Sequence, residues 1–148
     1  MSNRKNQKEF SCFGHYRNKP LAFNINRCTN MNNCFRTALW TGENLQITLM
    51  SIPVRCDIGE EIHPDVDQFI RVQSGFGRVV FKDCNGNVDF CEDINANSAV
   101  VIPANTLHNI INTGRTPLKL YSIYAPPQHP YDTLHKTKKD AEEHCERC

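Results

Sequence analysis

The chain has 148 residues, a common size for one globular domain and long enough to bury a core without disulfides or structural metals. Seventeen Lys and Arg residues stand against sixteen Asp and Glu residues, so the formal net charge is only +1 at pH 7. This balance argues against nucleic acid or an anionic membrane surface as a partner. The longest apolar runs, such as residues 99–103, are too short to span a bilayer.

The first nine residues are polar, and no apolar stretch of the kind found in a secretory signal follows them. We therefore expect a cytoplasmic protein whose thiols stay reduced. Six cysteines are scattered at irregular spacing and are predicted to be free: Cys12, Cys28, Cys34, Cys56, Cys84 and Cys91. Cys145 and Cys148 form a CxxC pair at the end of the chain, and no second such pair completes a zinc site, so we assign them no role.

Residues 1–19 are polar and are predicted to form a flexible N-terminal segment. Residues 21–25 could form a short strand, and the Asn-rich stretch 26–33 indicates a turn or a short helix. Strand-length runs then follow at 35–40, 45–52, 69–72, 78–82, 99–102, 107–111 and 118–124, with a further strand starting at Val88 after the Asn85-Gly86 hairpin signal. Many short strands at regular spacing indicate an all-β sandwich or barrel.

We expect a barrel over residues 20–128 and a C-terminal loop and helix over residues 129–148. The stretch 136–146 is charged and lacks Gly and Pro, which favours a short helix packed outside the barrel.

Two clusters of polar residues carry the chemistry. In the first, Glu61 and His63 are two residues apart, so on an extended chain their side chains share a face. Gln68 shares a face with Ile70 and Val72 and is therefore a polar group among buried residues, which needs a partner such as a metal or its bound water. In the second cluster, the turn-forming stretch 103–106 places His108 at the start of a strand.

These clusters resemble the two motifs of the cupin superfamily, and the spacing matches in full. The first motif is Gly, five residues, His-x-His, three or four residues, Glu, six residues and Gly. The second motif is Gly, five residues, Pro-x-Gly, two residues, His, three residues and Asn. In the first motif, Arg55 stands at the first Gly, Glu61 and His63 at the His-x-His, Gln68 at the Glu and Gly75 at the last Gly. In the second motif, Asn97 and Asn105 stand at the glycines, and Pro103, His108 and Asn112 match. Asn is a mild replacement at the two glycine positions of the second motif, because it tolerates a left-handed backbone well. Arg is a less suitable replacement for Gly, so the turn at Arg55 could differ from the turn in the family.

The resemblance implies a cupin jelly-roll β-barrel that holds one divalent transition metal ion (Mn, Fe, Zn or Ni) on Glu61, His63, Gln68 and His108. This ligand set carries a net charge of −1, because Glu61 supplies the single anion. Two imidazoles and one carboxylate resemble the facial triad of non-haem iron enzymes. Gln68 is a weak neutral ligand and could instead hold a metal-bound water. Jelly rolls expose sheet edges, so the resemblance also implies a homodimer.

Further stretches, including 38–46 and 63–69, resemble small bacterial cupins that are often labelled mannose-6-phosphate isomerase-like. Three functions stay open. The first is Lewis-acid isomerisation or epimerisation of a small polar, sugar-like molecule, for which no base can be named. The second is an iron-dependent oxidoreductase of dioxygenase type. The third is a non-enzymatic module that binds a small ligand.

Several other polar and aromatic residues receive the plainer interpretation. Trp40, Phe69 and Tyr124 are expected to line the core or the barrel lumen. His129 and His135 could border the mouth of the barrel, but we expect them to be exposed loop residues.

Overall fold

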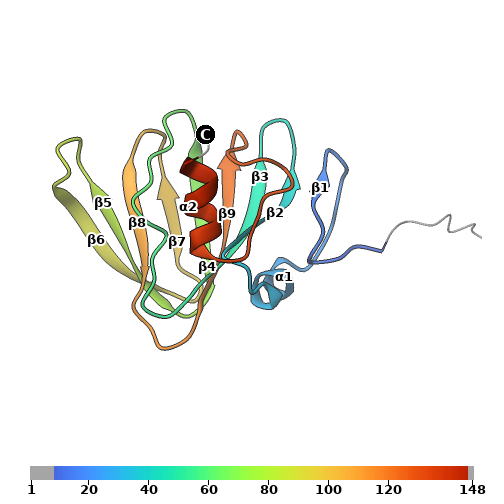
Figure 1. Cartoon of the computed structure of the whole chain (residues 1–148), viewed down its shortest axis with the longest axis horizontal. Helices are drawn as coiled ribbons and strands as arrows, with labels where there is room; N and C mark the ends of the chain where they lie inside the picture. The colour runs from blue at the N-terminus through green and yellow to red at the C-terminus, as the bar shows by residue number, and fades with distance from the viewer. Residues whose placement is uncertain (1–8, 147–148) are drawn as a thin grey trace, which may run out of the picture.

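The computed structural model describes residues 9–146 and shows a jelly-roll fold built from two β-sheets with two short helices (Figure 1). The elements are β1 (Tyr16–Arg17), α1 (Ile25–Met31), β2 (Arg36–Thr41), β3 (Gln46–Ile52), β4 (Asp67–Ser74), β5 (Phe76–Lys82), β6 (Val88–Asn95), β7 (Ala99–Ile102), β8 (Leu107–Asn112), β9 (Leu118–Ala125), β10 (Leu134–His135) and α2 (Lys138–Glu146). The fold class predicted from the sequence is confirmed.

The larger sheet has the strand order β1-β2-β3-β9-β4-β7, with β10 also paired to β2, and the smaller sheet has the order β6-β5-β8. The hydrophobic core lies between the sheets. It takes Ile70 and Leu120 from the larger sheet and Val79 and Ile110 from the smaller one, and all four are buried. Alternation along β4 follows the sequence prediction, because Gln68, Ile70 and Val72 are buried while their neighbours are more exposed.

Four turn positions share the left-handed backbone that favours glycine. Gly75 has a φ of 97°, and a Cβ there would come within 3.0 Å of the Pro117 carbonyl oxygen. Asn97 and Asn105 have φ values of 73° and 62°, as expected for Asn at a glycine position. Arg55 also adopts a φ of 64°, so its turn keeps the same handedness despite the bulky side chain.

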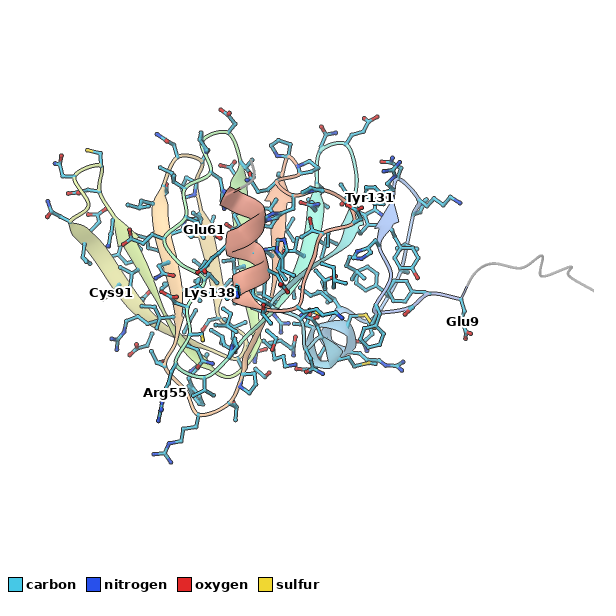
Figure 2. The ribbon with its side chains drawn as sticks, viewed as in Figure 1. Glu9, Arg55, Glu61, Cys91, Tyr131 and Lys138 are labelled. Atoms are coloured by element: carbon cyan, nitrogen blue, oxygen red, sulfur yellow. A yellow bond between two sulfur atoms is a disulfide. The ribbon has the colours of Figure 1, made fainter. Side chains whose placement is uncertain are left out.

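The region before β2 corrects two sequence predictions. Residues 21–24 form no strand, and α1 begins at Ile25 with Asn24 as its N-cap. Cys12 and Cys28 form a disulfide rather than free thiols, and it is visible beside α1 in Figure 2.

The described part of the predicted N-terminal segment makes contacts with the larger sheet. Phe10 and Tyr16 stack with ring centroids 5.2 Å apart, and both pack against a cluster of Leu39 and Leu49 from the larger sheet and Cys28 from α1. These contacts hold residues 10–16 on the outer face of that sheet. Residues 1–8 lie outside the described part of the chain.

The C-terminal region returns to the barrel. β10 pairs with β2, which places His135 opposite Arg36. The helix α2, near the predicted position, is tied to the barrel by an ion pair between Lys138 and Asp57, and its Ala141 joins the core between the sheets. Of the CxxC pair, Cys148 and the side chain of Cys145 lie outside what the structure describes. No helix in the described residues is long and apolar enough to cross a membrane.

Candidate metal centre

The two polar clusters meet through a backbone bridge. Glu61 N donates to the His108 carbonyl at 2.9 Å, and His108 N donates to the Glu61 carbonyl at 3.0 Å. The bridge puts the loop after β3 against the start of β8. As a result, ligand-type atoms of Glu61, His63 and His108 all lie within 4.8 Å of one another.

The side chains of this cluster point ligand-type atoms into a buried space. His108 Nδ1 lies 2.9 Å from the Thr106 carbonyl oxygen, which acts as acceptor when Nδ1 carries the proton, and this leaves Nε2 with its lone pair toward the cluster. Burial lowers the pKa of His108, partly offset by this hydrogen bond, so the neutral form is favoured. His63 Nε2 lies 3.4 Å from Glu61 Oε2.

Neither His108 Nε2 nor His63 Nε2 has a hydrogen-bond partner among the described residues, although both are buried. Buried nitrogen atoms without partners are costly, and a bound cation would satisfy both. The residues present therefore fit a divalent metal ion.

Gln68 lies on the inner face of β4, where the sequence predicted it. Its Nε2 donates to Ser122 Oγ at 3.2 Å, which fixes the orientation of the amide. Its Oε1 is buried and has no hydrogen-bond partner among the described residues. This oxygen is thus free to accept from a ligand or a metal-bound water, or to coordinate.

Arg36 is a member of the site that the sequence analysis missed. Its Nη2 lies 3.1 Å from Glu61 Oε1, and the arginine side chain is almost fully buried on β2. Burial alone would raise the pKa of Glu61, but the nearby His63 imidazole and the charge of Arg36 lower it to about 2. The available signal was a charged residue inside the apolar run 35–40, which indicates a buried partner.

A family model described as a cupin domain matches residues 48–124, which is more than half of the chain. The chain belongs to the cupin family. The uncharacterised protein YrkC of Bacillus subtilis is 56% identical over 126 residues, covering 85% of this chain and 68% of YrkC.

Two solved structures are similar to this cupin. The crystal structure of BH2720 from Bacillus halodurans is 54% identical, covers 84% of this chain and 95% of that one, and superposes with a TM-score of 0.83. Oxalate decarboxylase of Bacillus subtilis, an enzyme with Mn(II) centres, is 17% identical to this chain. The match has a TM-score of 0.54 and covers 60% of this chain and 23% of that one. The second likeness concerns the fold alone.

Two aromatic side chains extend the cupin site beyond the motifs. Tyr124 is fully buried on β9, with its ring centroid 5.7 Å from that of His63 and 5.1 Å from that of His129. Burial raises the pKa of Tyr124 to about 12, so the phenol stays protonated. Its Oη forms no well-aligned hydrogen bond with the described residues.

The predicted exposure of two loop histidines is wrong. His135 is buried within β10. His129 is partly buried, with Nε2 inaccessible to solvent, and burial together with the charge of Arg36 lowers its pKa to about 3. His129 is therefore a neutral imidazole beside Tyr124.

His129 is held there by one side chain of β3. The fully buried Gln46 donates from Nε2 to the His129 carbonyl oxygen at 2.8 Å. Its Oε1 accepts from the backbone N of Gln128 at 3.1 Å and of His129 at 2.9 Å. We call residues 126–135 the strap, because this segment runs from β9 to β10 and is fastened by Gln46.

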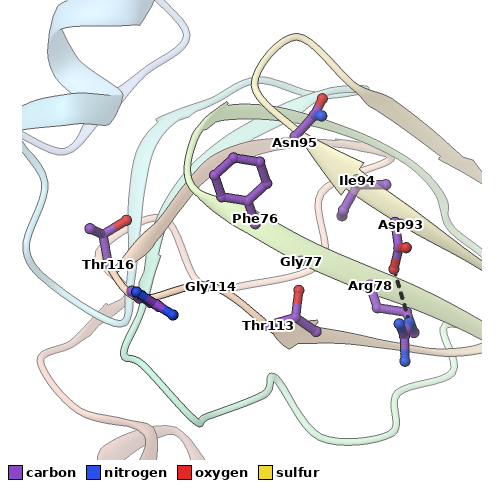
Figure 3. A pocket seen from close by; sticks show the side chains of 10 residues that line it. Phe76, Gly77, Arg78, Asp93, Ile94, Asn95, Thr113, Gly114 and Thr116 are labelled. Atoms are coloured by element: carbon purple, nitrogen blue, oxygen red, sulfur yellow. Dashed lines mark hydrogen bonds and ion pairs between the residues drawn. The ribbon is translucent and has the colours of Figure 1, made fainter.

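A surface pocket of about 570 Å³ lies elsewhere, and Figure 3 shows its lining. Phe76, Arg78 and Thr113 border it, and Arg78 is paired with Asp93 at 3.0 Å. In the β5–β8 register this end pairs Gly77 with Asn112, whereas His108 pairs with Phe81. Four residues of strand separate the two positions, roughly 13 Å at ~3.3 Å per residue, so this pocket is distinct from the candidate metal centre.

Proposed function

We propose that this cupin binds one divalent transition metal ion (Mn, Fe, Zn or Ni) through Glu61, His63 and His108. Gln68 would add its amide oxygen, directly or through a bound water. The observation that carries the proposal is the convergence of three ligand-type side chains within 4.8 Å, with both imidazole Nε2 atoms buried and without hydrogen-bond partners among the described residues. A donor set of two imidazoles and one carboxylate suits a divalent transition metal.

With the metal bound, we propose that the protein acts on a small polar, sugar-like molecule by isomerisation or epimerisation. A bound divalent ion supplies Lewis acidity to a substrate carbonyl. The chain's own groups would orient the ligand: His129 is a neutral imidazole that can donate or accept, and Tyr124 is a protonated phenol in a buried position. The buried setting would strengthen each of these contacts.

A second candidate is an iron-dependent oxidoreductase of dioxygenase type. The specific observation in its favour is the donor set of two imidazoles and one carboxylate, which leaves other coordination positions open. Oxygen consumption by the iron-loaded protein with a small organic substrate would favour this function over isomerisation.

The first experiment is elemental analysis of purified, untagged protein beside the His63→Ala, His108→Ala double variant. We expect close to one equivalent of metal in the wild type and none in the variant. The metal found then directs the substrate screen: a redox-stable ion favours isomerisation or simple binding, and iron favours oxygen chemistry. If both proteins stay empty after growth with supplemented metals, the metal proposal is wrong and a non-enzymatic binding module becomes the better explanation.

We also propose that the protein forms a homodimer. The edge strand β6 leaves Val88 and Phe90 59% and 51% exposed, and the Phe90 ring lies 4.6 Å from that of Phe81 on the neighbouring strand β5. A second copy covering this edge would remove both the apolar surface and the unpaired strand edge. Light scattering coupled to gel filtration should give a dimer mass for the wild type and a monomer mass for Phe90→Glu. A monomeric wild type would contradict the proposal.

A further inference from the structure

The surface pocket of about 570 Å³ lies at the end of the smaller sheet that is away from the candidate metal centre (Figure 3). Phe76 begins β5, Asn95 ends β6 opposite it, and residues 113–116 form the loop after β8. All three segments line the pocket. Its volume falls within the range of roughly 300–1,000 Å³ that is usual for sites that bind small molecules.

The loop 113–116 is fixed in place by one buried side chain. Asn112 donates from Nδ2 to the carbonyl oxygens of Ile52 and Thr116, both at 2.9 Å. Its Oδ1 accepts from Gly114 N at 2.9 Å. Gly114 also lies close to β5, because a Cβ there would be 3.3 Å from Phe76 Cβ. A pocket wall that is already ordered costs little entropy when a ligand binds, and this favours affinity.

Phe76 gives the pocket an aromatic surface. Its side chain is 61% exposed although it stands on a regular strand between Asn95 and the Gly114 loop. Exposure of a phenylalanine is not by itself a sign of binding, since Phe13 is 66% exposed and lines no such pocket among the described residues. Phe76 differs because its ring borders a hollow, where a second aromatic ring can stack on it and leave water.

Arg115 gives the pocket an available positive charge. It is exposed and makes no ion pair or side-chain hydrogen bond with the described residues. Arg78, the other arginine of the lining, is already held by Asp93 at 3.0 Å. A free guanidinium binds a carboxylate or a phosphate through two parallel hydrogen bonds, so Arg115 favours an anionic group.

We propose that this pocket binds a small molecule in which a planar aromatic ring carries a carboxylate or a phosphate. The ring stacks on Phe76, and the anionic group pairs with Arg115. Thr113 and Asn95 border the same space and offer polar side chains to the ligand. This second site is independent of the proposed metal centre, so neither one depends on the other.

The test is an NMR titration of the isotope-labelled, full-length protein, which reports both affinity and location. Naphthoate is the anionic probe, and naphthamide is its neutral counterpart of nearly the same shape. We expect naphthoate to shift the amide signals of residues 76–78 and 113–116, with a dissociation constant of about 1 mM or below. Naphthamide should bind about threefold more weakly, because a charge pair at an exposed site contributes modestly.

The choice between the two anionic groups is made with naphthyl phosphate under the same conditions. Tighter binding than naphthoate supports a phosphate as the natural group, and weaker binding supports a carboxylate. If neither anion binds more tightly than naphthamide, the proposed role of Arg115 is wrong.

Two variants separate the ring from the charge, and both lie at exposed positions where the fold should tolerate them. Phe76→Ala removes the stacking surface, so naphthoate and naphthamide should both bind about fivefold more weakly or worse. Arg115→Met keeps an apolar stem but removes the charge. It should weaken naphthoate by about threefold and leave naphthamide unchanged.

Phe13→Ala and Arg27→Met are the matched controls, because they remove an equally exposed ring and another exposed arginine outside the pocket. Neither should change the affinity for naphthoate. Equal naphthoate affinity in the wild type, Phe76→Ala and Arg115→Met would overturn the inference.

The metal-site variant His63→Ala, His108→Ala keeps the two proposals distinguishable, since it should bind naphthoate as tightly as the wild type does. If naphthoate instead shifts the signals around Glu61, and the double variant abolishes those shifts, the ligand binds at the metal centre and the pocket proposal is wrong. The pocket proposal also fails if the signals of residues 76–78 and 113–116 do not move up to about 10 mM naphthoate.

Discussion

Strands β3 and β6 lie in the same barrel but in opposite environments. All of β3 except Ile47 is buried, whereas in β6 only Ile94 is buried. β3 lies in the middle of the larger sheet, with the core on one face and the segment 10–31 on the other. β6 is an edge strand with nothing described against its free side. Burial here is decided by the cover that the rest of the chain provides. A strand covered on both faces is buried along nearly its whole length, and in β3 this includes the polar residues Gln46 and Thr48.

The largest expected effect comes from opening the outer face of the larger sheet. Leu49 is fully buried on β3, in the cluster with Cys28 and Leu39. Leu49→Ala should lower the free energy of unfolding by about 3–4 kcal/mol, because it removes buried methyl groups and leaves a cavity. Denaturant unfolding followed by circular dichroism measures it. Val88→Ala on β6 is the matched control and should change stability by less than about 0.5 kcal/mol; equal losses at both positions would undo the contrast between the strands.

The disulfide within the segment 10–31, which covers the outer face of the larger sheet, should contribute somewhat less to the free energy of unfolding. Cys12 and Cys28 are 16 residues apart, and closing a loop of this length contributes about 3 kcal/mol in the chain-entropy account. The Cys12→Ser, Cys28→Ser double variant, or reduction of the wild type, should lower the unfolding midpoint accordingly. Cys84→Ser, Cys91→Ser, at exposed positions, should not. A reducing compartment would withdraw this contribution, so thiol trapping in cells would also show which state the protein uses.

The contribution of the buried Glu61 to the free energy of unfolding should depend on pH, whereas the contributions from the outer face should not. The pKa of Glu61 is lowered from 4.5 to about 2 in the folded protein, so its contribution is present above pH 4.5 and is lost as the pH falls toward 2. The shift corresponds to about 3 kcal/mol at most. Unfolding of metal-free protein between pH 7 and pH 2 should show this loss in the wild type but not in Glu61→Gln. A parallel decline in both would mean that other carboxylates account for it.

The smallest expected effect lies at a turn. Arg55 holds a left-handed φ of 64°, which costs a non-glycine residue roughly 1 kcal/mol. Arg55→Gly should relieve this strain at some cost in chain entropy and raise the free energy of unfolding by up to about 1 kcal/mol. Thermal unfolding monitors the change, and Gly59→Arg, at a φ of 82° with open space around it, provides the reverse comparison. Destabilisation by Arg55→Gly would show that the Arg55 side chain makes a compensating contact.

The strands that the sequence predicted best are those with a buried, apolar stripe. The predicted strand 99–102 coincides with β7, and the run 118–124 matches β9 to within one residue. β6 was located only at its start, because Asp89, Glu92 and Asp93 interrupt any apolar pattern on an edge strand. Polar edges carry little periodic signal, so edge strands are harder to predict than central ones.

For the site, local spacing predicted what lies close in sequence. Glu61 and His63 share a face because they are two residues apart, and the turn before β8 places His108 at the strand's start. Arg36, His129 and the Cys12–Cys28 bond were missed because each depends on segments that meet only after folding. In addition, Arg36 inside the apolar run 35–40 indicates a buried partner without identifying it, and His129 after two prolines looks like an ordinary loop residue. No spacing rule marks them.

The strap has a consequence for solvent exchange. Loop amides normally exchange their hydrogens with water within seconds, but the amides of Gln128 and His129 donate to the oxygen of the fully buried Gln46. These two hydrogens should exchange as slowly as those of a central strand. Their exchange rates would then report how often the strap detaches and exposes His129 to water.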